Sequence, residues 1–151
     1  METGKALVAG TAGSLAFITI HEALRKVDRK APRMDILGQR ALVKFTRGTG
    51  TRPPQAEWLY YSWLCAEIMS NALYFSLVGL SRKNPVTAGA GLGLGLAAGV
   101  LTLAGPLGVG KPLVEVRTGT ALRTLAIYAA GGLVAGAVHA WLGKAERNSR
   151  P

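Results

Sequence analysis

Only one cysteine, Cys65, occurs among the 151 residues, so the chain can form neither an internal disulfide nor a metal site built from several cysteines. Acidic residues are also scarce, at 8 against 18 Lys and Arg, and the formal net charge is +10. A soluble nucleic-acid binder would spread this charge among polar residues, whereas here the charges cluster and long stretches have none. We therefore expect anionic lipid headgroups, and no nucleic acid, as the partner of the basic residues.

Long apolar stretches take up most of the remaining sequence. Hydrophobic residues make up 49% of the chain and the mean hydropathy is +0.25. Uncharged runs of this length are what a bilayer requires of a spanning helix. The predicted spans cover about 6–24, 58–80, 85–107 and 119–142. The sequence thus predicts an all-α integral membrane protein, a bundle of four transmembrane helices in a single membrane domain over residues 1–151.

The first apolar segment is short enough to need an alternative interpretation. Its uncharged core, Ala6 to His21, holds 16 residues, which span roughly 24 Å as a helix. Because Lys5 precedes this core, a cleaved signal peptide would look similar. No small-x-small cleavage site precedes the His21–Glu22 pair, and three more apolar segments follow. We therefore favour a retained helix.

A basic connector over residues 25–57 joins the first two spans. Within it, apolar and basic residues both recur at helical spacing but on different faces, which predicts a short amphipathic helix lying in the membrane interface. The segment from Gly48 to Pro54 should end that helix. The basic residues expected to contact lipid headgroups are Arg33, Arg40, Lys44 and Arg47.

The distribution of Lys and Arg predicts the orientation of the chain. With four spans, the two termini and the turn at 81–84 share one side with 6 basic residues, and the other side carries 12, of which 9 belong to the connector. The positive-inside rule then places connector 25–57 in the cytoplasm and both termini outside. We expect a multi-pass protein of the cell (inner) membrane.

Small residues repeat at helical spacing in three of the spans. Lipid tails are as apolar as leucine, so close van der Waals packing of small residues is what holds membrane helices together. The second span is bulky and aromatic, and we expect it to face a partner or lipid. The small residues expected to pack between helices are Gly10, Ser14, Gly91, Gly95, Gly99, Gly132 and Gly136.

One ionisable residue, Glu67, lies near the middle of the second span. Such residues are costly in lipid and are functional candidates by default, here for proton relay or for contact with an ion or substrate. The alternative is a neutral Glu67 that hydrogen-bonds Asn71, one helical turn away on the same face. This Glu-x-x-x-Asn pair on a second helix loosely resembles the small membrane glutathione-transferase and leukotriene-enzyme group. The arginine-rich surroundings typical of that group are missing here, so we assign no family.

A second candidate cluster lies where the first span meets the connector. His21 and Glu22 end that span, and Arg123 begins the fourth span on the same side, so Glu22 and Arg123 could form a structural ion pair. A site for a lipidic substrate, with Arg33 as a further headgroup contact, is the alternative. The segment His21–Asp35 looks like a motif to which we attach no function. His139 lies near the opposite side from His21, which disfavours haem bound between them.

These patterns leave three hypotheses about function. The first is a non-enzymatic structural or accessory subunit that forms homo-oligomers or packs with other membrane subunits. The second is a small membrane enzyme acting on a lipidic substrate near the cytoplasmic interface. The third is an oligomeric channel or transporter that uses Glu67. We expect no cofactor and no metal.

Overall fold

The computed structural model describes residues 2–28, 31, 33–81, 83–110 and 118–148. The elements in chain order are α1 (Glu2–Val27), α2 (Met34–Gly48), α3 (Ala56–Ser76), its 3₁₀ continuation η1 (Leu77–Leu80), α4 (Pro85–Leu103) and α5 (Thr118–Asn148). Four helices, α1, α3 with η1, α4 and α5, are long and apolar enough to cross a membrane. The predicted all-helical architecture with four candidate spans is confirmed, and the described residues contain no strand.

Local sequence signals account for where the helices begin and end. Asn84 caps α4, because its Oδ1 accepts hydrogen bonds from the backbone N–H groups of Val86 and Thr87 at 2.9 and 3.3 Å. Pro85 then occupies the first helical position, where its missing N–H costs nothing. The helix ends at Leu103, before Pro106, as expected of a residue that cannot continue a helix.

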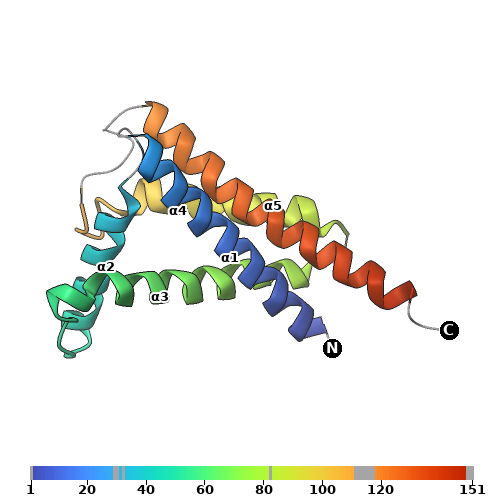
Figure 1. Ribbon diagram of the computed structural model, residues 1–151, viewed down its shortest axis with the longest axis horizontal. Helices are drawn as coiled ribbons and strands as arrows, with labels where there is room; N and C mark the ends of the chain where they lie inside the picture. Colours follow the sequence, from blue (N-terminus) through green and yellow to red (C-terminus); the bar gives the residue numbers. More distant parts are fainter. Residues whose placement is uncertain (1, 29–30, 32, 82, 111–117, 149–151) are drawn as a thin grey trace.

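The helices pack in a chain of neighbours rather than around one central axis. In Figure 1, α5 lies along α4 and along α1, and α1 in turn crosses α3. By contrast α3 and α4, although consecutive in sequence, diverge from the turn that joins them. The short helix α2 lies at the open end of this divergence, against α3.

Glycine backbones meet directly where α4 packs on α5. A Cβ added to Gly132 would collide with the carbonyl group of Gly89, and one added to Gly93 would collide with the backbone of Tyr128. Gly136 lies equally close to the carbonyl of Pro85. Gly132 and Gly136, two of the residues predicted to pack between helices, thus lie where the backbones of α4 and α5 approach most closely.

On α4, the glycines predicted to pack, Gly91, Gly95 and Gly99, do not lie on the face that is turned towards α5. Gly91 has no atom within 4 Å of an added Cβ, and Gly95 and Gly99 meet only the ends of side chains, at 3.5 and 4.0 Å. The buried face of α4 consists instead of Gly89, Gly93, Ala97 and Leu101. Both sets repeat every four residues, so periodicity alone could not say which face turns towards α5.

The first helix holds both of its neighbours through small residues. A Cβ on Gly13 would collide with the backbone of Gly131 in α5, and one on Gly10 with the carbonyl of Ala72 in α3. Ser14 is fully buried and its hydroxyl donates to the carbonyl of Ile68 at 2.9 Å. The bulky second span thus meets α1 through small residues of its own, while much of its remaining surface is exposed.

The orientation predicted from the Lys and Arg count depends partly on residues that lie outside the described ranges. Six of the basic residues counted for orientation fall there, namely Arg29, Lys30, Arg82, Lys111, Arg117 and Arg150.

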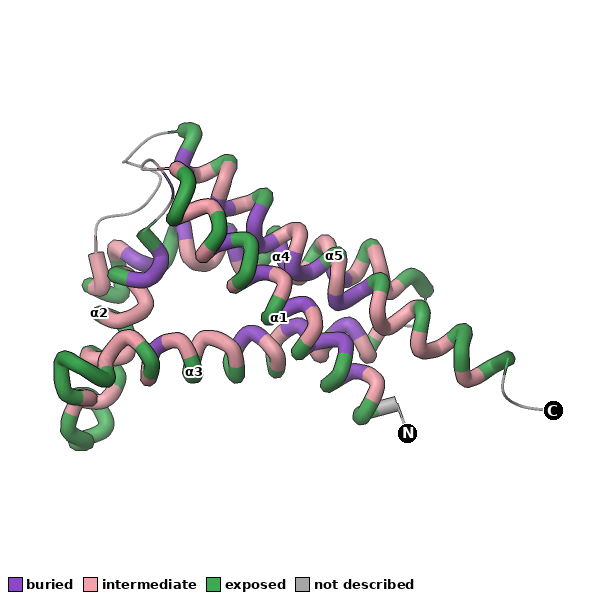
Figure 2. The backbone as a smooth tube through the Cα atoms, in the orientation of Figure 1, coloured by how far each residue is buried: buried purple, intermediate pink, exposed green. Residues whose placement is uncertain are grey.

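In the described part, burial follows the packing order of the helices: Figure 2 shows buried positions along the facing sides of α1, α4 and α5, and a more exposed α3.

Candidate functional site, a cavity between the spans

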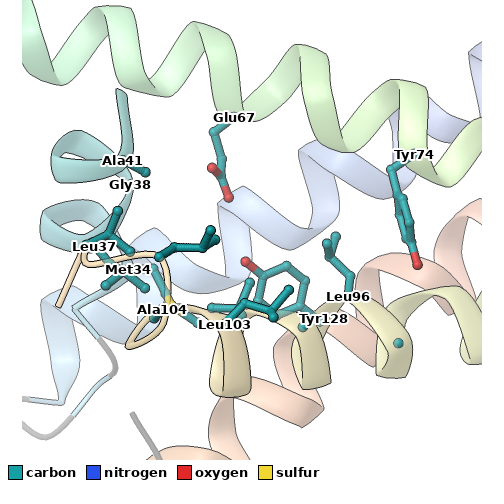
Figure 3. A pocket seen from close by; sticks show the side chains of 15 residues that line it. Met34, Leu37, Gly38, Ala41, Glu67, Tyr74, Leu96, Leu103, Ala104 and Tyr128 are labelled. Carbon is teal, nitrogen blue, oxygen red and sulfur yellow. The ribbon is translucent and has the colours of Figure 1, made fainter. Parts of the chain in front are cut away.

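The divergence of α3 from α4 leaves a partly open cavity of about 400 Å³ between them. Its walls come from α2, α3, α4 and the turn after α4, and Tyr128 of α5 contributes as well (Figure 3). The apolar lining residues are Met34, Leu37, Ala41, Leu96, Val100, Leu103, Ala104, Leu107 and Val109. Pockets of this size, mostly apolar and lying between helices of a bundle, are typical small-molecule sites.

The side chain of Glu67 points into this cavity from α3 (Figure 3). It lies near the middle of the Ala56–Leu80 span, where polar groups are costly. Its Oε1 accepts a hydrogen bond from Nδ2 of Asn71 at 3.2 Å, and Asn71 is itself buried. The pairing of Glu67 with Asn71, which the spacing allows, is therefore present.

Two tyrosines supply the other polar atoms of the cavity. Tyr74 donates its hydroxyl to the carbonyl of Leu92 at 3.2 Å, which ties α3 to α4 near the narrow end of the gap. Tyr128 is buried, its ring stacks on Phe17 with a centroid distance of 4.3 Å, and its hydroxyl points towards the side of the cavity from which Glu67 projects (Figure 3). Sequence reasoning missed Tyr128, because an aromatic residue in an apolar span is ordinary.

The glycines Gly95 and Gly99 line the same cavity. Because they carry no side chain, they leave the space on the α4 wall that a larger residue would fill. These two residues were predicted to pack against another helix. Within the chain, their effect is to keep a cavity open.

At the connector end, α2 closes over the cavity through another glycine that sequence reasoning missed. A Cβ on Gly38 would collide with the indole of Trp63, which is buried. Gly38 therefore lets α2 lie directly on α3, with Met34, Leu37 and Ala41 facing the cavity.

The His21 cluster forms a set of short ion pairs rather than a free polar pocket. Arg25 bonds Glu22 at 2.6 Å and Asp35 at 3.2 Å. Arg123 bonds Asp28 at 2.9 Å, so both members of the predicted Glu22–Arg123 pair are held by nearer partners. His21 is buried, and its ring lies parallel to that of Phe17 with a centroid distance of 6.2 Å. The cluster ties the end of α1 to the starts of α2 and α5.

Within this cluster, Asp35 at the start of α2 is buried between two guanidinium groups. It accepts hydrogen bonds from Arg33 at 3.1 Å and from Arg25 at 3.2 Å. Burial on its own would raise the pKa of Asp35, but the hydrogen bonds and charge of Arg33, with the charge of Arg25, hold that pKa below its usual value. The same pairing raises the pKa of Arg33.

The four residues predicted to contact headgroups have different surroundings. Arg33 is held by Asp35, whereas Arg40, Lys44 and Arg47 line a cavity of about 470 Å³ on α2. The ammonium of Lys44 donates to the carbonyl of Leu107 at 2.5 Å. Arg40 and Arg47 thus line this cavity, and neither forms an ion pair with another residue in the described part of the chain.

No group of three or more His, Cys, Asp or Glu residues that could hold a metal ion occurs in the described ranges. Cys65 is a free thiol on the exposed side of α3. Comparisons with protein families, with curated proteins and with solved structures find no match to this chain.

Proposed function

We propose that this protein binds a small amphipathic, lipid-like molecule inside the membrane, in the cavity between α3 and α4. The observation that carries the proposal is the carboxyl group of Glu67, which projects into an apolar cavity of about 400 Å³ near the middle of a span. An ionisable group at that depth marks a functional site by default. The carboxyl group and the Tyr128 hydroxyl together select a ligand that carries a hydrogen-bonding group.

The surroundings of the cavity favour binding over transport. Along most of its length the wall is aliphatic, which suits a hydrocarbon chain, and its polar atoms are few. Because α2 and the turn after α4 lie across the connector end, the space resembles a pocket more than a continuous path. A channel or transporter centred on Glu67 would need further copies of the chain to complete a pathway.

The subunit and enzyme hypotheses stay predictions with less support. Gly10, Gly132 and Gly136 are used for packing within the chain, so fewer small faces remain for self-association. The charges of Glu22, Arg33 and Arg123 are all held in ion pairs, which favours a structural role for the His21 cluster over acid–base chemistry on a substrate.

The proposal includes a position in the membrane. We place α2 in the interface on the cytoplasmic side, where its basic residues meet anionic headgroups, and both chain termini outside. The cavity then lies below α2, at the depth of the acyl chains. Its open side meets lipid, so a ligand enters from the bilayer rather than from water.

The test measures which lipids stay bound to the purified protein. The protein is extracted from membranes in mild detergent and its bound molecules are identified by native mass spectrometry and by chromatography of the extract. We expect a defined amphipathic molecule in about one copy per chain. A Gly95→Leu variant places a bulky side chain in the cavity and should lose it. Glu67→Gln should weaken its binding about tenfold, because it replaces the carboxyl group that faces the ligand.

A matched control uses the same helix. Gly91 lies one turn before Gly95 and an added Cβ there meets nothing within 4 Å, so Gly91→Leu should retain the ligand. If the Gly91 and Gly95 variants lose the ligand equally, any large side chain on α4 prevents binding, and the loss cannot be assigned to filling of the cavity. If the wild-type protein holds no molecule that the Gly95 variant lacks, the proposal is wrong.

A further inference from the structure

We propose a second binding site, for the phosphate group of an anionic phospholipid, at the opposite end of the bundle from α2. A cavity of about 450 Å³ lies there among the start of α1, the α3–α4 turn and the end of α5. Its lining includes Lys5, Lys83, Lys144 and Arg147, with Glu146 as the carboxylate. The proposal does not depend on the cavity between α3 and α4.

The charges of this cavity are not balanced within the described chain. Lys5 forms an ion pair with Glu146. Among the described residues, no carboxylate pairs with Lys83, Lys144 or Arg147. Among the described lining residues, four cationic side chains stand against one carboxylate.

The packing of the helices brings these basic residues together from distant parts of the sequence. Gly136 of α5 lies directly against the carbonyl of Pro85, which holds the turn before α4 on the end of α5. Arg147 folds back over Gly143, since its guanidinium lies 4.0 Å from a Cβ added there. A cluster on one exposed helix face would be an ordinary solvated surface, but these residues surround a hollow.

His139 adds a polar group at the inner wall of the cavity. Its Nδ1 is buried and has no hydrogen-bond partner, although buried polar atoms are normally satisfied. Its ring carbon Cε1 lies 3.7 Å from a Cβ added to Gly79 of η1. The imidazole is thus one more polar side chain at this wall of the cavity.

A neighbouring apolar hollow identifies the phosphate as one carried by a lipid. A space of about 250 Å³ lies between α1 and η1, lined by Ala6, Leu7, Leu77, Gly79 and Leu80 among others. The two hollows are neighbours, because Gly79 lines the apolar one and a Cβ added to it would lie 3.7 Å from Cε1 of His139, which lines the basic one. A phospholipid could place its phosphate among the lysines and an acyl chain along this apolar surface, whereas free phosphate would use only the first hollow.

The test compares lipid binding by the full-length protein in detergent, after removal of endogenous lipid. Native mass spectrometry follows titration with phosphatidylglycerol, with phosphatidylcholine and with inorganic phosphate. We expect phosphatidylglycerol to bind most tightly. The Lys144→Ala/Arg147→Ala variant should lose about tenfold or more in affinity, because two charge-assisted contacts are removed. A Lys144→Arg/Arg147→Lys variant keeps both charges and should retain most of the binding.

The control variant removes two positive charges from residues outside this cavity. Lys26 and Arg52 are exposed and lie outside this cavity, so Lys26→Ala/Arg52→Ala should bind phosphatidylglycerol like the wild type. The site is refuted if both double-alanine variants lose the same affinity, or if phosphatidylcholine binds equally well. Inorganic phosphate that binds as tightly as the lipid would overturn the assignment to a phospholipid.

Discussion

At the scale of single residues, Asp35 shows how a buried charge organises the connector end of the molecule. It receives Arg25 from α1 and Arg33 from the segment before α2, so one carboxylate joins two parts of the chain. Sequence reasoning identified the surrounding segment as a possible motif without a function. The ion pairs suggest that its role is to fix the start of α2.

The first prediction concerns the pH dependence of stability. Because the pKa of Asp35 lies below its usual value in the folded protein, its ionised form stabilises the fold above the unfolded pKa, and that contribution is lost as pH falls through the lowered value. Asp35→Asn should cost about 1–3 kcal/mol at neutral pH. It should also show a smaller loss of stability than the wild type when the pH falls below about 4.

Thermal unfolding followed by circular dichroism in mild detergent, over a series of pH values, measures both effects. Glu57→Gln removes an equal charge from an exposed position and serves as the control. Identical pH profiles for the wild type and Asp35→Asn would contradict the assigned role.

At the scale of elements, the contact of α4 with α5 depends on backbone meeting backbone. Gly132 and Gly89 face each other with no room for a methyl group on either. In lipid, where burial of larger apolar side chains gains little, such close approach is the main source of packing energy.

The second prediction follows from this contact. Gly132→Ala forces the two helices apart and should destabilise the protein by about 1–3 kcal/mol, the range expected of overpacking. Gly91→Ala adds the same methyl group where no atom lies within 4 Å and should leave stability unchanged. Unfolding midpoints of the two variants in the same detergent make the comparison. Equal midpoints would mean that α4 presents another face to α5.

The elements also mark how far the sequence could lead. The four spans were predictable because hydrocarbon thickness sets the length of an uncharged helix. Glu67 stood out because a carboxyl group in that setting is unusual. The rotation of α4 could not be predicted, since the stripes that contain Gly89 and Gly91 have the same spacing. Gly38 and Trp63 meet although they lie on different helices, and no local sequence pattern predicts their contact.

At the scale of the whole molecule, the cavity arises from the order in which the helices pack. Because α5 and α1 lie between α4 and α3, the two walls of the cavity are not required to touch along their length. This is a property of the complete arrangement, so it cannot be read from any one segment. The positions of the lining residues could be predicted only once that arrangement was known.

The third prediction concerns the orientation of the chain. In a Cys65→Ala background, Thr49→Cys marks the connector and Ser81→Cys marks the α3–α4 turn. Because the connector side carries 12 of the 18 Lys and Arg, Thr49→Cys should face the cytoplasm. A membrane-impermeant maleimide added to intact cells should label Ser81→Cys, and it should label Thr49→Cys only after permeabilisation. Labelling of both from the same side would exclude an odd number of crossings between them.

The packing of Gly10 and Ser14 on α3 has a consequence for ligand uptake. Helix α3 packs mainly on α1 and makes few contacts with α4. The width of the opening between α3 and α4 therefore depends on how α3 packs against α1. A bulkier residue at Gly10 would push α3 away from α1 and change its tilt. This would change the width of the opening between α3 and α4, although residue 10 does not contact the ligand. Residues that lie far from the bound ligand would then help to decide which ligands can enter the cavity.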